Sequence, residues 1–266
     1  MPSSNPPIFW GSRLCRVALS ERFNHRFPWL VLALGVVIRM TYPVAYKQVV
    51  ESEFGFIENA TVAFLALTVF VSIRVYRARI GFPENWFGPF MLVFCAGAIY
   101  FAGEECSWGQ HWFGWDTPEA IAEVNAQDET NLHNTSSWFN EIPRLVLELT
   151  ILVGLIWAFV RSRIVANSEC DDSWQAWLLP ARACWSVALA TVLVQYPERF
   201  GKLFPEATGA SHWNFRLAEY QEFFFSIYLL TYVCSILYRL NEKDQADEVV
   251  TLPLRPAQFE DLQRAA

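Results

Sequence analysis

The residues best suited to acid–base or metal chemistry gather in one stretch, residues 103–134. It opens with two adjacent carboxylates, Glu104 and Glu105, directly after an apolar run, and continues through His111, Glu129 and His133 without any Lys or Arg. Carboxylates at the end of a membrane helix are energetically costly and need a reason. Neutral imidazoles beside carboxylates suit zinc, and a carboxylate that remains unbound can act as general base on metal-bound water. The stretch therefore predicts a catalytic site, with zinc as its candidate cofactor.

Helical spacing predicts which of these side chains share a face. If a helix continues past the apolar run, Glu104, Trp108 and His111 follow one another at i, i+4 and i+7. Glu129 and His133 are four residues apart and share a face in the same way. Neighbouring helix positions point about 100° apart, so we expect Glu104 to face the bundle and move protons while Glu105 caps the helix or faces solvent.

Further polar residues lie near the ends of other apolar runs and complete the set of candidates. Acidic residues at helix ends are also common for structural reasons, since the helix dipole favours them at an N-terminus. His212 can equally be a surface residue of a connecting loop. The candidate catalytic carboxylates are Glu58, Glu104, Glu105 and Glu129; the candidate metal ligands are His111, His133 and His212; the other polar candidates are Arg39, Gln110, Asn131, Glu148 and Glu222.

The elements that must position these residues are membrane helices. The chain of 266 residues is 53% hydrophobic and only 18% charged, which is too apolar for an ordinary soluble protein. Its apolar residues fall into runs of about 20, the length of helix that crosses a hydrocarbon core. We predict an all-α fold, a six-helix transmembrane bundle, because lipid cannot satisfy a bare backbone. The predicted spans are Phe27–Tyr46, Phe54–Ile73, Trp86–Glu104, Ile142–Val160, Trp177–Tyr196 and Ala218–Tyr238.

The distribution of cations predicts the orientation of this bundle. Cations precede the first span and follow the second, fourth and sixth, whereas few lie on the other side. The positive-inside rule therefore places both termini in the cytoplasm and the polar stretch outside. The predicted parts are a basic N-terminal segment (1–26), a six-span domain (27–240) with an outer polar loop (105–141), and an acidic cytoplasmic tail (241–266). In the loop, Thr117 is the predicted N-cap of a short interfacial helix near Glu119–Val124.

Two resemblances bear on function. The segments GEECSWGQHWFGW and NAQDETNLHN resemble a pattern of uncharacterised bacterial polytopic membrane proteins, which implies a bacterial inner-membrane setting. The chain is also similar to intramembrane glutamate proteases of the CAAX-processing type, whose sites pair an EExxxR motif with histidines on later helices. Glu104 and Glu105 match the paired acids, Gly109 stands at the position of the Arg, and His133 and His212 are the possible histidine partners.

Two classes of function follow from these residues, and a third is the alternative to both. The first is a metal-dependent hydrolase or transferase that acts on a lipid or lipid-linked substrate at the outer leaflet. The second is a transporter or proton-coupled translocator whose intramembrane carboxylates line an outward cavity, and the third is a membrane assembly subunit. Membrane lipid is the expected partner. Nucleic acid is not, because the net charge is −7.

Overall fold

The computed structural model confirms the all-α prediction. It describes residues 9–50, 55–78, 82, 84–125, 127–164, 173–204 and 216–251, and this part of the chain contains no strand. The helices are α1 (Phe9–Ala18), α2 (Glu21–Thr41), α3 (Pro43–Val49), α4 (Phe56–Arg77), α5 (Phe87–Glu105), η2 (Ser107–Gly109), α6 (Gln110–Phe113), α7 (Glu119–Ala122), α8 (Ser137–Ile164), α9 (Trp174–Leu178), α10 (Arg182–Leu193), α11 (Tyr196–Leu203) and α13 (Leu217–Thr251).

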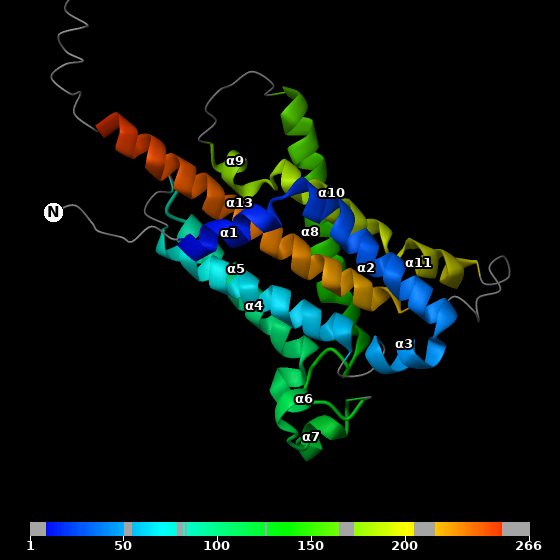
Figure 1. The fold of residues 1–266 in the computed structure, drawn as a ribbon. Coiled ribbons are helices and arrows are strands. Elements are labelled where there is room, and N and C mark those ends of the chain that lie inside the picture. The colour runs from blue at the N-terminus through cyan, green and yellow to red at the C-terminus, as the bar shows by residue number, and fades with distance from the viewer. Residues whose placement is uncertain are drawn as a thin grey trace, which may run out of the picture.

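Helix α13 forms the centre of the molecule. It packs against α4 and α10, and α4 and α10 in turn pack against α5 and α2, so that α13 lies between two helix pairs (Figure 1). Its apolar side chains are buried almost throughout, including Phe223, Phe224 and Ile227. Helix α8 contacts α10, and most of its surface is exposed. The loop that carries α6 and α7 extends beyond the helix ends on one side of the molecule (Figure 1).

Within the described residues, four helices are long and apolar enough to cross a membrane, which indicates a membrane protein. They are α4, α5, the part of α8 from Trp138 to Ile164, and the part of α13 from Leu217 to Lys243. Large apolar side chains such as Phe70 on α4 and Val153 on α8 are exposed, as a lipid-facing surface requires. These helices correspond to the second, third, fourth and sixth predicted spans.

The first and fifth predicted spans are each divided into shorter helices in the structure. None of these helices is both long and apolar enough to cross a membrane. α2 ends at Thr41, and α3 begins anew at Pro43. Pro180 separates α9 from α10, and Pro197 lies at the start of α11. Proline has no N–H to donate within a helix and also restricts the residue before it. α2 has enough residues but is not apolar enough, whereas α10 alone is too short.

A glycine allows α2 to approach α13 closely. A Cβ atom added at Gly35 would overlap the hydroxyl of Tyr220 and lie 2.8 Å from its Cζ. Tyr220 is buried, and its Oη lies 3.4 Å from the Oη of Tyr46 on α3. Since the ring has no room to move, any larger residue at this position would separate the two helices.

Two local predictions differ from the structure. The predicted acidic tail does not begin as a separate segment at residue 241, because α13 continues as far as Thr251; residues 252–266 lie outside the described part. The short loop helix is present as α7, but Pro118 occupies its N-cap position. The hydroxyl of Thr117 instead donates to the carbonyl oxygen of Asp128, which ties the two sides of the loop together.

Candidate functional site

The polar stretch begins at a sharp turn that ends α5. Ser107 and Trp108 have φ of 46° and 56°, and Gly109 has φ of 100°. L-residues other than glycine seldom adopt positive φ, so a helix cannot continue through this segment. The predicted face shared by Glu104, Trp108 and His111 is therefore wrong, because it assumed an unbroken helix. The turn lays the Trp108 indole against Gly103, where an added Cβ would lie 2.8 Å from the ring.

Glu104 fastens the loop to the end of α5. Its Oε2 accepts hydrogen bonds from the backbone N–H groups of Leu132 (2.7 Å) and His133 (2.8 Å), and its Oε1 accepts one from the Trp108 indole (2.9 Å). The His133 Nδ1 lies 3.6 Å from the same Oε2. Glu104 is buried, so its carboxylate joins two segments that are 28 residues apart. Glu104 therefore holds the loop against the end of α5, as a latch does, and does not share a helix face with His111.

We expect Glu104→Ala to release this latch. Two part-buried backbone N–H groups would lose their acceptor, and because water reaches them in part, the lower end of the cost of about 1–3 kcal/mol for an unsatisfied donor applies. Hydrogen exchange of the Leu132 and His133 amides should accelerate by at least tenfold. The matched control is Glu119→Ala, an exposed carboxylate of the same loop, which should leave these amides protected. Unchanged exchange in Glu104→Ala would show that the latch contributes nothing.

Glu129 holds His111 within the loop. The Glu129 Oε1 lies 3.1 Å from the His111 Nε2, and its Oε2 accepts from the Ser107 hydroxyl (3.0 Å) and the Asn134 amide (2.9 Å). The Asn131 amide also donates to this Oε2. Because a carboxylate only accepts, we assign the proton of the neutral imidazole to Nε2, which leaves Nδ1 as the basic nitrogen. Glu129 therefore fixes the orientation of the His111 ring.

The remaining amides of the loop form a scaffold around this pair. The Gln110 Oε1 accepts from the Thr130 N–H (2.6 Å) and its Nε2 donates to the Thr117 hydroxyl (2.8 Å). The buried Asn125 accepts from the Glu129 N–H (3.2 Å) and donates to the Asn131 carbonyl (2.9 Å). Gln110 and Asn131, both predicted as site candidates, therefore hold the loop in shape.

The loop covers a polar chamber at the ends of the long helices. Its volume is about 430 Å³, and α4, α5, α8, α11 and α13 each contribute to its wall together with the loop. Six carboxylates and two guanidinium groups line it, with both histidines of the loop. The charged and imidazole side chains are Glu58, Glu105, Glu129, Glu198, Glu219, Glu222, Arg144, Arg216, His111 and His133. The predicted residues Glu58, Glu105, Glu129, Glu222, His111 and His133 are thus brought together.

Some charged side chains of the polar chamber have hydrogen-bond or ion-pair partners, whereas others have atoms without one. Arg144 donates to Glu222, and the Arg216 Nη2 lies 3.3 Å from the Glu219 Oε1. The Glu198 Oε1 accepts from the Leu217 N–H (2.8 Å) at the start of α13. Among the described residues, no donor reaches the buried Glu58 Oε2. Both arginines therefore have a carboxylate partner, although the Arg144 Nε is buried without one among the described residues, and the carboxylates outnumber the guanidinium groups.

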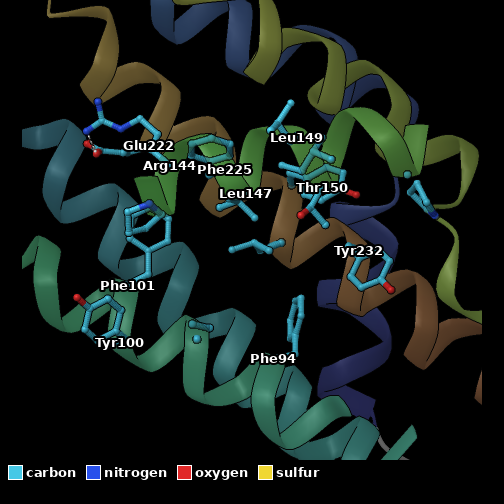
Figure 2. A pocket seen from close by; sticks show the side chains of 18 of the residues that line it. Phe94, Tyr100, Phe101, Arg144, Leu147, Leu149, Thr150, Glu222, Phe225 and Tyr232 are labelled. Atoms are coloured by element: carbon cyan, nitrogen blue, oxygen red, sulfur yellow. Dashed lines mark hydrogen bonds and ion pairs between the residues drawn. The ribbon is translucent and has the colours of Figure 1, made fainter. Parts of the chain in front are cut away.

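A second cavity begins where the polar chamber ends. This groove, about 770 Å³, runs along α5, α8 and α13 and is lined mainly by aromatic and aliphatic side chains. Figure 2 shows the Arg144–Glu222 pair at one end and the side chains of Phe94, Leu147, Phe225 and Tyr232 further along. The groove and the polar chamber share five wall residues, which are Glu105, His133, Asn140, Arg144 and Glu222. The two cavities therefore adjoin at this wall, one of them mainly apolar and the other charged.

Four predicted candidates line neither cavity: Gln110 and Asn131 of the loop, Glu148 and Arg39. Glu148 is buried in a two-pronged pair with Arg199 of α11, with 2.8 Å between Oε1 and Nη1 and 2.6 Å between Oε2 and Nη2. Arg39 lies over the Tyr46 ring, 5.3 Å from its centroid, and lines neither cavity. His212 lies outside the described residues. Glu148 and Arg39 therefore contribute to neither the groove nor the polar chamber.

The predicted zinc site is not assembled from the residues that the structure describes. These residues contain no group of three or more His, Cys, Asp or Glu side chains that could hold a metal ion. His111 pairs with Glu129 and His133 lies beside Glu104, so the two imidazoles have different carboxylate neighbours. Cys106 is not a ready nucleophile, because burial raises the pKa of its thiol.

Several contributors to the site are absent from the predicted set, among them Ser107, Asn125, Asn134, Glu198 and Arg216. Ser107 and Asn125 support Glu129, and Glu198 caps α13 within the wall of the polar chamber. Ser107 and Asn125 are small polar residues of the kind found in any loop, so only their tertiary partners distinguish them. No protein-family model, curated protein or solved structure matches the chain. Function is therefore inferred from the site itself.

Proposed function

We propose that the protein binds one lipid or lipid-linked molecule and hydrolyses or transfers a group at its polar end. The supporting observation is the shared wall between the apolar groove and the polar chamber. The apolar chain of such a molecule fits the groove, whose volume lies within the range of about 300–1,000 Å³ that is usual for ligand sites. The head group then lies beside Glu105, His111 and His133.

His111 is the proposed general base, and Glu129 is its positioning residue. Glu129 fixes the ring through Nε2, so that Nδ1 can accept a proton from water or from a hydroxyl of the substrate. A positioned acid or base of this kind typically contributes about 10²–10⁴-fold to rate. A zinc-dependent version needs a third ligand besides His111 and His133, and His212 is the remaining candidate. The metal content of the purified protein distinguishes the two versions.

We also propose that the chain crosses the membrane six times. α2 spans 21 residues, and α10 with α11 reaches from Arg182 to Leu203, so both can complete a six-crossing bundle although they are less apolar or interrupted. The polar chamber lies at the N-terminal ends of α4, α8 and α13, whereas Arg77 and Arg163 lie at the opposite ends of α4 and α8. The positive-inside rule then places both termini in the cytoplasm of a bacterium and the polar chamber outside the inner membrane.

The experiment compares lipid extracts from cells that lack the protein with extracts from cells that express it or a variant. We expect wild-type protein to convert at least one lipid species, and His111→Gln and Glu129→Gln to reduce that conversion by at least 100-fold. His25→Gln is the matched control, since His25 is an exposed residue of α2 whose Nδ1 lies near the Glu21 carbonyl. Full conversion by His111→Gln would remove the acid–base proposal.

A further inference from the structure

The polar chamber has more carboxyl groups than cationic partners for them. Six carboxylates face two guanidinium groups, and both guanidinium groups are engaged by Glu222 and Glu219. Glu198 is used as the cap of α13, and Glu129 is surrounded by donors from the loop. Glu58 and Glu105 then remain as the carboxylates that line the space without an arginine partner among the described contacts.

One oxygen atom of Glu58 is the clearest example of a carboxylate without a partner. Its Oε2 is buried, and no donor from the described residues reaches it. A carboxylate out of contact with water is destabilised unless a hydrogen bond or an opposite charge compensates it. A positively charged group with N–H donors in the polar chamber supplies both the hydrogen bond and the opposite charge. An anionic group would instead be repelled by the carboxylates, which outnumber the two guanidinium groups by six to two.

We propose that the occupant of the groove and polar chamber is a membrane lipid whose head group carries an ammonium ion. The groove takes its acyl chain, and Glu58 and Glu105 receive the ammonium group through charge-assisted hydrogen bonds. The sign of the unpaired charge selects this head group over an anionic one of similar size. This inference rests on the proposed function, since it names the class of lipid that the same site accepts.

The test compares two lipids with identical acyl chains, phosphatidylethanolamine and phosphatidylglycerol, which differ in whether the head group ends in an ammonium ion or a diol. The full-length protein is reconstituted in vesicles with equal amounts of both and then transferred to detergent. The lipid that it retains is quantified by mass spectrometry. We expect at least tenfold enrichment of phosphatidylethanolamine. Equal retention of the two lipids, or a preference for phosphatidylglycerol, would overturn the inference.

The variant Glu58→Gln, Glu105→Gln keeps the shape of both side chains and removes their charge. We expect it to retain a similar total amount of lipid with less than threefold enrichment of phosphatidylethanolamine, whereas Glu119→Gln should behave as wild type. Each single variant is measured as well, so that unfolding of the double variant leaves a readout. Full enrichment in the folded charge variants would contradict the inference.

This design separates failure of the head-group inference from failure of the proposed function. If the protein retains both lipids equally, and if filling the groove with the Gly97→Trp side chain abolishes this retention, only the ammonium inference is contradicted. A wild-type protein that retains neither lipid contradicts the proposed function as well.

Discussion

Gly97→Trp should reduce the lipid retained by the purified protein by at least tenfold. Gly97 lies on the α5 wall of the groove, and a Cβ added there meets no atom within 4 Å. A side chain at this position therefore extends into open space instead of disturbing the core. An indole is among the largest side chains, so it should occupy volume that an acyl chain needs.

The matched control is Ile99→Trp. Ile99 is an exposed residue of the same helix and does not line the groove. The Ile99→Trp variant should therefore retain as much lipid as the wild type does. Lipid is measured by mass spectrometry after detergent exchange, and the melting temperature of each variant confirms that the fold is intact. Equal retention by Gly97→Trp and Ile99→Trp would show that lipid does not occupy the groove.

Arg199→Ala should cause a large loss of stability. Glu148 is 5% exposed and depends on Arg199 for both of its strong hydrogen bonds, with a weaker one from the Gln221 amide at 3.2 Å. Removing one partner of a buried pair leaves a charge without compensation and costs about 3–5 kcal/mol. The Arg199 side chain is 40% exposed, so water replaces part of its contribution and the lower end of that range applies.

The measurement is thermal unfolding in detergent, followed by tryptophan fluorescence. A loss of about 3 kcal/mol corresponds to a decrease in melting temperature of roughly 6–12 °C in a domain of this size. The second variant, Arg199→Ala with Glu148→Leu, should recover most of the loss, because it removes the unpaired charge as well. Arg182→Ala, at an exposed arginine of α10, controls for the loss of a cation. A melting temperature unchanged in Arg199→Ala would show that the pair has no structural role.

The location of the site follows from the sequence more readily than its internal contacts. Alternating helix directions bring Glu58, Glu105 and Glu222 to one end of the bundle, and the apolar runs with their flanking cations carry that information. The divisions at Pro43, Pro180 and Pro197 coincide with prolines, but Pro28 and Pro143 lie inside unbroken helices, so a proline alone does not mark a division. Length of apolar sequence alone conceals these interruptions.

The turn after α5 has a weaker signal. Ser107 and Trp108 adopt positive φ only because the surrounding loop holds them there, and residues of these types rarely do so on their own. The different contacts of Glu104 and Glu105 depend on this turn. Similarly, the partner of Glu148 is chosen by the packing of α8 against α10 and α11, which no local pattern encodes.

The most direct test of the lipid site uses a phospholipid with a photoactivatable diazirine at the end of one acyl chain. Groove occupancy places this end near Phe90, Phe94 and Trp157, far along the groove from the polar chamber. We expect cross-links to concentrate on the peptides that carry these residues and to fall by at least tenfold in Gly97→Trp. Cross-links spread evenly over the exposed faces of α2, α4 and α8, and unchanged in Gly97→Trp, would contradict the proposal that the groove holds a lipid.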